Sequence, residues 1–183
     1  ARRAELAGAD ALHLDIMDGH FVPNLSMGPA VVAMAHEVVS IPLSVHLMMT
    51  NPEQYVLRFI EAGADRLMIH IEAACNVPEV LQRIREQGVK PGITINPDTP
   101  PEMLFPVLGA VDEVLCMTVR PGFGGQAFMP EVLPKVRALR HYATQNNLAD
   151  LSILVDGGIN VETAMQCAAH GADAMIAGTS LYR

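Results

Sequence analysis

The sequence predicts an α/β fold built on a parallel sheet, and three observations lead to this prediction. The chain has 183 residues, of which 50% are hydrophobic, which suits one sizeable core and argues against a disordered chain. Short β-like runs alternate with helix-like stretches along the sequence. The third observation is an internal repeat, in which a helix-like stretch stops at a glycine and a β-like run follows at once.

The repeat is clearest at three places, where Glu5–Asp10 precedes ALHLDIMD, Glu61–Asp65 precedes RLMIHIE, and Ala169–Asp173 precedes AMIAG. In each copy the glycine suits the left-handed position that follows a helix C-terminus. Weaker copies occur at REQGVKPGITINP and LGAVDEVLCMTV. We therefore expect seven strands alternating with helices, and the strands start near residues 12, 43, 67, 91, 113, 152 and 174.

The faces of these strands favour a closed barrel over an open sheet. Strands of an open sheet with helices on both faces are apolar almost throughout. Here polar residues from five strands share a face, as His13 and Asp15 do opposite Leu14. Polar side chains that converge at strand C-terminal ends are typical of a barrel mouth. We predict a (β/α)8 TIM barrel in which residues 1–183 form a single domain.

Both ends of this predicted barrel are incomplete. The chain opens in the helix-like stretch ARRAELAGAD, has no initiator methionine, and stops just after the last predicted strand. A barrel of this class has eight strands. We therefore expect strands 2 to 8 to be present, with the first strand and the last helix missing.

Charge and composition argue against several classes of function. The formal net charge is −8 and only 12 residues are Lys or Arg, so a nucleic-acid partner is not expected. No apolar run reaches the roughly 18 residues of a membrane span and no signal peptide is visible, so we expect a cytoplasmic protein without a membrane partner that acts on a small metabolite. Cys75, Cys116 and Cys167 are far apart, which favours reduced core residues over disulfides or a cysteine-rich zinc site.

Four residues form the strongest candidate site. His13 and Asp15 project in the same direction from one strand, and His46 belongs to the next. Asp156 ends a strand on the other side of the predicted barrel. Two imidazoles and two carboxylates are a ligand set for one divalent metal ion, namely Zn, Fe, Mn or Co. The alternative is a structural hydrogen-bonded network without a metal.

Glycine-rich loops are a second signal. RPGFGGQ follows one predicted strand, Gly157 and Gly158 follow the next, and Gly178 and Thr179 follow the last. Backbone N–H groups at glycines approach anions closely, and barrel loops after strands 7 and 8 often hold a phosphate. Ordinary turns are the alternative.

The methionines and lysines indicate the function less strongly than the candidate ligands and the glycine-rich loops do. Met17 and Met48 share faces with the candidate ligands and offer polarisable sulfur, whereas strand alternation leaves the facing of Met117 ambiguous. Neither Lys90 nor Lys135 lies at a strand C-terminal end, which disfavours Schiff-base chemistry. GxSxG and GxxxxGK[ST] are absent, so hydrolase and kinase functions lack their motifs.

Six segments of the chain resemble the ribulose-phosphate 3-epimerase family in the same order and with similar gaps. They are LHLDIMDGHFVPNLSMGP, SVHLMMTNPEQY, GITINPDTPPE, CMTVRPGFGGQAFMPE, VDGGIN and GADAMIAGTSLY. Family members are (β/α)8 barrels that use one divalent metal to interconvert D-ribulose 5-phosphate and D-xylulose 5-phosphate. The resemblance therefore implies an isomerase of the pentose phosphate pathway and, by analogy, a homo-oligomer.

The resemblance also implies a role for each matching residue. Asp15 and Asp156 exchange the C3 proton by way of a cis-enediolate and share the metal with His13 and His46. Met17, Met48 and Met117 surround the intermediate. Substrate and phosphate contacts fall on His46, Gly122, Phe123, Gly124, Gly125, Gly157, Gly158, Gly178 and Thr179. Thr179 stands where the family usually has serine, and the family's first strand, with its substrate-contacting serine, has no counterpart in the sequence.

Two other functions stay open at this point. The same metal and acids, with a longer pocket, suit an epimerase acting at C3 of D-allulose 6-phosphate. A non-catalytic sugar-phosphate-binding barrel is the alternative from a different class, and its sign would be an absent metal or an incomplete acid pair.

Overall fold

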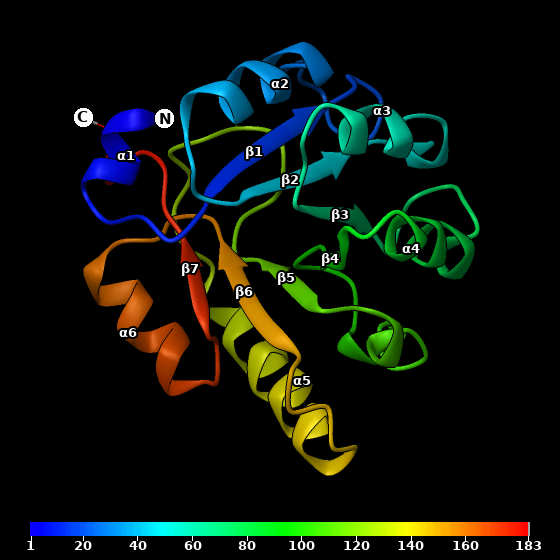
Figure 1. Cartoon of the computed structure of the whole chain (residues 1–183). Coiled ribbons are helices and arrows are strands. Elements are labelled where there is room, and N and C mark those ends of the chain that lie inside the picture. Colours follow the sequence, from blue (N-terminus) through cyan, green and yellow to red (C-terminus); the bar gives the residue numbers. More distant parts are fainter. Residues whose placement is uncertain (183) are drawn as a thin grey trace. The chain divides into compact units, whose positions relative to one another are not determined.

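The computed structural model describes residues 1–182 as alternating helices and strands (Figure 1). The strands are β1 (Leu12–Met17), β2 (Leu43–Met48), β3 (Arg66–His70), β4 (Lys90–Ile95), β5 (Glu113–Met117), β6 (Ser152–Asp156) and β7 (Ala174–Ile176). The α-helices are α1 (Arg2–Leu6), α2 (Pro29–Val38), α3 (Val56–Glu61), α4 (Val77–Glu86), α5 (Leu133–Gln145) and α6 (Val161–Ala169). Every strand starts at, or one residue before, its predicted position, so the predicted strand starts are confirmed.

The sheet is parallel and its strand order follows the chain from β1 to β7. The chain divides into two compact units, Ala1–Gly92 and a second one that begins at Ile93. The single domain expected for residues 1–183 stays a prediction. No helix within residues 1–182 is both long enough and apolar enough to cross a membrane.

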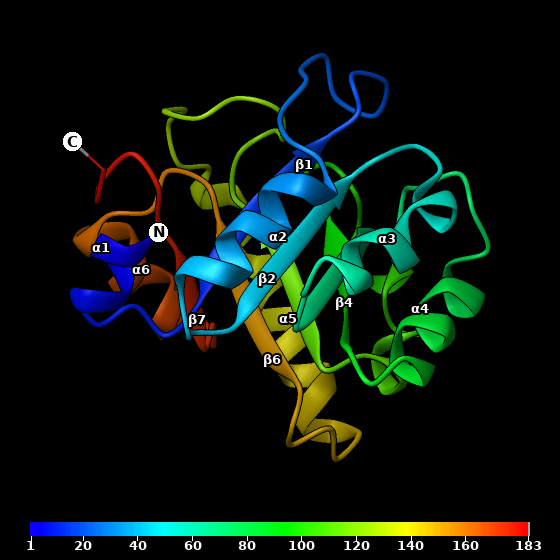
Figure 2. The same cartoon turned by 45° about the horizontal axis from the view of Figure 1, so that its top comes forward.

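The first unit contains β1, β2 and β3, with α2, α3 and α4 along one side of these strands (Figure 2). Alternation along each strand sends one set of side chains toward the helices. Ile16, Leu47 and Ile69 belong to this set and are each at most 1% exposed. Burial of such a side chain contributes about 1.5–3 kcal/mol relative to exposure. The opposite face of the same strands is therefore left for polar side chains.

The second unit contains β5, β6 and β7 and the helices α5 and α6 (Figure 1). Asn160 caps the N-terminus of α6: its side chain accepts from the backbone N–H of Thr163, and the Thr163 hydroxyl accepts from the backbone N–H of Asn160. Val136, Leu139 and Ile153 are buried where α5 packs beside β6. The Thr163 hydroxyl also donates to the Gly158 carbonyl over 3.1 Å, which ties the start of α6 to the turn before it.

The Gly-Ala-Asp repeat has a structural cause. Gly63 and Gly171 have φ values of +100° and +99°, so both adopt the left-handed conformation expected after a helix. Two residues later the Asp65 carboxylate accepts from the backbone N–H of Leu43, and the Asp173 carboxylate accepts from that of Ile153. Each aspartate thus fastens the start of its own strand to the start of the strand before it.

Two expectations are wrong in detail. Between β4 and β5 the structure has the short 3-10 helices η2 (Pro101–Met103) and η3 (Leu108–Ala110) where a full helix was expected. Pro100, Pro101 and Pro106 explain this, because proline donates no N–H and disfavours helical backbone in the residue before it. Cys75 is only partly buried, at the turn after β3, whereas Cys116 and Cys167 are core residues as predicted.

Two further 3-10 helices lie before α-helices. They are η1 (Pro52–Gln54), which precedes α3, and η4 (Pro130–Val132), which precedes α5. Each begins with proline, whose fixed φ suits the first position of a helix.

Candidate metal and active site

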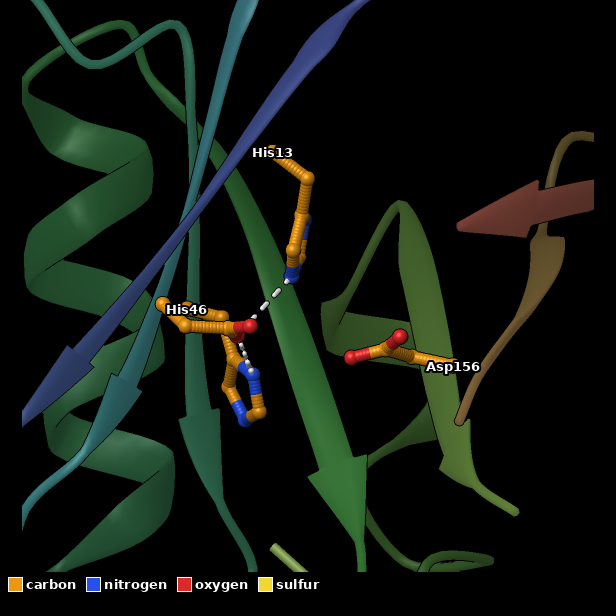
Figure 3. Close-up of side chains that lie close together, drawn as sticks. His13, His46 and Asp156 are labelled. Atoms are coloured by element: carbon orange, nitrogen blue, oxygen red, sulfur yellow. Dashed lines mark hydrogen bonds and ion pairs between the residues drawn. The ribbon is translucent and has the colours of Figure 1, made fainter. Parts of the chain in front are cut away.

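Three of the four predicted ligands come together in the first unit. Asp15 on β1 pairs in register with His46 on β2, and Asp15 Oδ1 lies 2.9 Å from His46 Nδ1. His13, two residues before Asp15, places its Nε2 at 3.4 Å from the same carboxylate oxygen. Both imidazoles point toward this carboxylate (Figure 3). The ligand atoms of the three residues lie within 4.8 Å of one another.

The donor set of this cluster fits a divalent cation. One carboxylate and two imidazoles converge, which is a mixed oxygen and nitrogen set of the kind that first-row metal ions prefer. His13 Nδ1 lies 3.1 Å from the hydroxyl oxygen of Ser44, so this hydrogen bond holds the ring with Nε2 toward Asp15. A possible His/Asp metal site is therefore present, and the ligand role of each residue stays a prediction.

Burial and hydrogen bonding set the charges of the cluster. Burial raises the pKa of Asp15, but hydrogen bonding and charge interaction with His13 and His46 together lower it by more, so the pKa lies well below the usual range of a carboxyl group. Burial lowers the pKa of His46 to about 4, against a smaller opposite effect from the hydrogen bond to Asp15. An ionised carboxylate therefore faces a neutral imidazole at pH 7, and both have lone pairs to offer.

His70 and Glu72 extend the cluster beyond His46. His46 Nε2 lies 2.8 Å from His70 Nε2, and His70 Nδ1 lies 3.1 Å from Glu72 Oε2. The imidazole of His70 also packs against the Phe21 ring, with 4.5 Å between ring centroids. The sequence alone gives His70 and Glu72 no role, because strand alternation shows which face a side chain is on but not how close it lies to another.

The loop after β1 is held by a residue that sequence analysis missed. The Asp18 carboxylate accepts from the backbone N–H groups of His20, Phe21 and Thr50. Burial raises the pKa of Asp18, but these backbone donors lower it by more. Because Thr50 follows β2, this carboxylate ties together the loops after β1 and β2. The Asp-Gly pair at the start of the turn is the signal that pointed to it.

Strand register shows where the three methionines lie. Met17 pairs with Met48 at the ends of β1 and β2, and Met48 is buried. Met117 pairs with Asp156 at the ends of β5 and β6 and is buried. Residues paired in a parallel sheet share a face, so the ambiguous facing of Met117 is settled: its side chain lies on the face of Asp156.

Asp156 and the glycine-rich turn lie in the second unit. Asp156 is the last residue of β6, and its backbone carbonyl accepts from the Thr118 N–H. The Thr118 hydroxyl donates to the Gly157 carbonyl over 2.7 Å. A Cβ atom on Gly157, at φ +121°, would lie 2.4 Å from Val119, and one on Gly158, at φ +64°, would lie 2.6 Å from the backbone nitrogen of Phe128. Only glycine fits at these two positions.

The loops after β5, β6 and β7 meet within this unit. A Cβ atom on Gly124 would lie 3.8 Å from the Thr179 methyl group, and the Ser180 hydroxyl donates to the Ile159 carbonyl over 2.7 Å. Phe123 is exposed in the same region. The remaining predicted phosphate contacts in these loops are Gly122 and Gly125, both with positive φ, and Gly178, where a Cβ would meet open space.

The structure is an α/β fold that carries a cluster of histidine and aspartate side chains suited to hold a metal ion. A mutant tryptophan synthase alpha-subunit from Pyrococcus furiosus shares the fold with a TM-score of 0.73 at 16% identity, covering 98% of this chain and 80% of that one. A FabK mutant from Thermotoga maritima gives a TM-score of 0.61 at 17% identity, over 98% of this chain and 65% of that one.

Sequence comparison then identifies the family. A model of the ribulose-phosphate 3 epimerase family matches residues 1–182. The chain is 46% identical to the ribulose-phosphate 3-epimerase of Bacillus subtilis over 97% of this chain and 82% of that one. It is 45% identical to the cytoplasmic isoform from Oryza sativa over 100% of this chain and 79% of that one. The chain belongs to the ribulose-phosphate 3-epimerase family, a family of isomerases, as the motifs predicted.

Proposed function

We propose that this protein interconverts D-ribulose 5-phosphate and D-xylulose 5-phosphate by inverting C3, as a step of the pentose phosphate pathway. The observation that carries this proposal is the Asp15 carboxylate, held ionised between His13 and His46 at 3.4 and 2.9 Å in a chain of this family. Such a carboxylate is in the ionised form that a general base requires.

The proposed reaction needs two acid/base groups. Inversion beside a ketone requires that a proton leave one face of the carbon and that another arrive on the opposite face. We assign these tasks to Asp15 and Asp156, with a cis-enediolate between the two transfers. Support for Asp156 comes from its place at the end of β6 and from the family match across VDGGIN. Met17, Met48 and Met117 exclude water around the reacting carbon.

We further propose that His13, Asp15, His46 and Asp156 hold one divalent ion, namely Zn, Fe, Mn or Co. The donor chemistry of the three residues in the first unit supports this set. When bound, such an ion supplies positive charge that stabilises negative charge developing on substrate oxygens. The imidazoles keep the Asp15 carboxylate in place for its proton transfer, because each contacts the same oxygen.

The substrate phosphate is assigned to the three loops that meet in the second unit. Backbone N–H groups at Gly157 and Gly158 and at the Gly122–Gly125 segment, with the Thr179 hydroxyl and Gly178 N–H, provide neutral donors for an anion. This explains how a chain with a formal net charge of −8 binds a phosphate ester.

The proposal also covers the fold, the location in the cell and the oligomeric state. We propose that the seven strands are strands 2 to 8 of a (β/α)8 barrel in one domain, supported by relatives and fold neighbours of greater length. A cytoplasmic location is supported by the name of the rice relative, and a homo-oligomer by analogy with the family. Sedimentation of the full-length protein measures the latter directly.

An NMR assay tests the proposed reaction. Full-length protein, supplied in turn with each divalent ion, is incubated with D-ribulose 5-phosphate and with D-allulose 6-phosphate, and C3 epimers are quantified. We expect faster turnover of the pentulose phosphate. Preferred turnover of the hexulose phosphate would move the assignment to the related epimerase, and binding of both without turnover would indicate a non-catalytic sugar-phosphate-binding protein.

A further inference from the structure

A continuous chain of close polar contacts runs from Asp15 into the core of the first unit. Asp15 Oδ1 lies 2.9 Å from His46 Nδ1, His46 Nε2 lies 2.8 Å from His70 Nε2, and His70 Nδ1 lies 3.1 Å from Glu72 Oε2. The two imidazoles are 0% exposed, so solvent does not reach their ring nitrogens. Both ring nitrogens of each histidine are therefore committed within the chain.

The three contacts have fewer hydrogens than they need. Each of the three contacts needs one hydrogen, and the carboxylates of Asp15 and Glu72, when ionised, only accept. A neutral imidazole carries a single N–H, so His46 and His70 together supply two hydrogens for three contacts. With both carboxylates ionised and both imidazoles neutral, one of the three contacts therefore has no hydrogen.

A cation bound by Asp15 and His46 would remove this shortage. His46 Nδ1 would then offer its lone pair to the cation, and no hydrogen would be needed there. His46 Nε2–H would donate to His70 Nε2, and His70 Nδ1–H would donate to Glu72. Every contact would then be satisfied by two neutral imidazoles, and the Glu72 end of the chain would leave His46 Nδ1 unprotonated.

We propose that His70 and Glu72 are positioning residues, which hold His46 with an unprotonated Nδ1 directed at the divalent ion. This inference rests on the proposed metal site and concerns residues outside the ligand set. The contact of the His70 ring with Phe21, at 4.5 Å between centroids, supports it, because it restricts rotation of the ring that receives the His46 N–H.

Matched variants of the full-length protein test the proposal by Zn²⁺ affinity, measured in competition with a chromophoric chelator. His70→Phe keeps a buried ring but removes the acceptor, and we expect it to lose about 10- to 100-fold in affinity. His70→Gln keeps an acceptor near the position of Nε2 and is expected to recover most of that loss. Glu72→Leu removes the far end of the chain at a partly exposed position and is expected to weaken binding in the same direction.

Ile69→Val is the control for a general loss of core packing. Ile69 is 0% exposed on the same strand as His70 but faces the opposite way, so this variant should bind Zn²⁺ like the wild type. A second readout is the ¹⁵N spectrum of the histidine rings. We expect His46 to be the Nε2–H tautomer in the Zn²⁺-loaded wild type and to lose that preference in Glu72→Leu.

The outcomes separate this inference from the proposed function. If the wild type binds no divalent ion, the metal site itself is wrong. If the wild type binds Zn²⁺ while His70→Phe and Glu72→Leu bind it equally tightly, or if His46 carries its hydrogen on Nδ1 in the loaded protein, only the positioning role is wrong. Should His70→Phe not fold, the comparison of Glu72→Leu and His70→Gln with Ile69→Val decides the question.

Discussion

Asp15 and His46 are direct partners across two parallel strands, and the carboxylate of one lies 2.9 Å from the imidazole of the other. The register between β1 and β2 therefore decides whether these two side chains can contact each other. A shift of the pairing by one residue would turn either side chain to the helix-covered face, where apolar residues such as Leu14 and Val45 now lie.

Replacement of Asp15 by asparagine tests the proton-transfer role. Asparagine keeps the size of the side chain but accepts a proton far less readily, so we expect Asp15→Asn to lose about 100- to 10,000-fold in kcat. The circular dichroism spectrum should match that of the wild type, because the residue lies on the polar face of β1. A kcat within tenfold of the wild-type value would contradict the assignment.

Alanine substitutions at Gly158, in the turn after β6, and at Gly109 should differ in their effect on stability. In Gly158→Ala a side chain is forced at φ +64° against the Phe128 backbone, so we expect a loss of about 1–3 kcal/mol or more in the free energy of unfolding. Gly109 has open space around it and no positive φ, and Gly109→Ala should change stability by less than about 0.5 kcal/mol. Urea titrations measure both values, and equal effects would show that the turn tolerates a side chain.

The lowered pKa of Asp18 predicts that the contribution of its carboxylate to stability depends on pH. Its pKa is lowered in the folded protein, so the carboxylate stabilises the fold above the unfolded value of 3.8, and this contribution is lost as the pH falls through the folded value. Asp18→Asn should therefore lower Tm at pH 7. The Tm difference from the wild type should shrink as the pH drops below 3.8. A difference that is independent of pH would mean that the charge of Asp18 contributes nothing.

Thiol reactivity tests the burial of the cysteines. Burial raises the pKa of Cys116 to about 12, and those of Cys75 and Cys167 to about 11. Only thiolates react readily with a disulfide reagent. At pH 8 the folded protein should react slowly, with Cys75 first because it is partly exposed, and the protein in denaturant should react rapidly at all three positions. Rapid reaction of Cys116 in the folded protein would contradict its place in the core.

Much of the fold could be predicted because periodic signals carry it. Alternation placed His13, Asp15 and His46 on one face, and the repeated Gly-Ala-Asp unit located the strand starts. The helix expected between β4 and β5 was wrong because the repeat was weighed above Pro100, Pro101 and Pro106.

The rest of the site depends on information that one strand at a time does not contain. Met117 faces the same way as Asp156, but only the register between β5 and β6 shows this. The contacts of His70 with His46 and Glu72 depend on rotamers and distances across strands, and the three backbone bonds of Asp18 depend on loop conformation.

Exchange of the C3 hydrogen in D₂O shows directly whether Asp15 and Asp156 act as the two acid/base groups. Full-length wild-type, Asp15→Asn and Asp156→Asn proteins are incubated with D-ribulose 5-phosphate, and deuterium at C3 of both epimers is followed by NMR. We expect the wild type to form D-xylulose 5-phosphate labelled at C3, and each variant to form the second epimer at least about 100-fold more slowly. Substantial conversion by either variant would show that inversion does not need both aspartates.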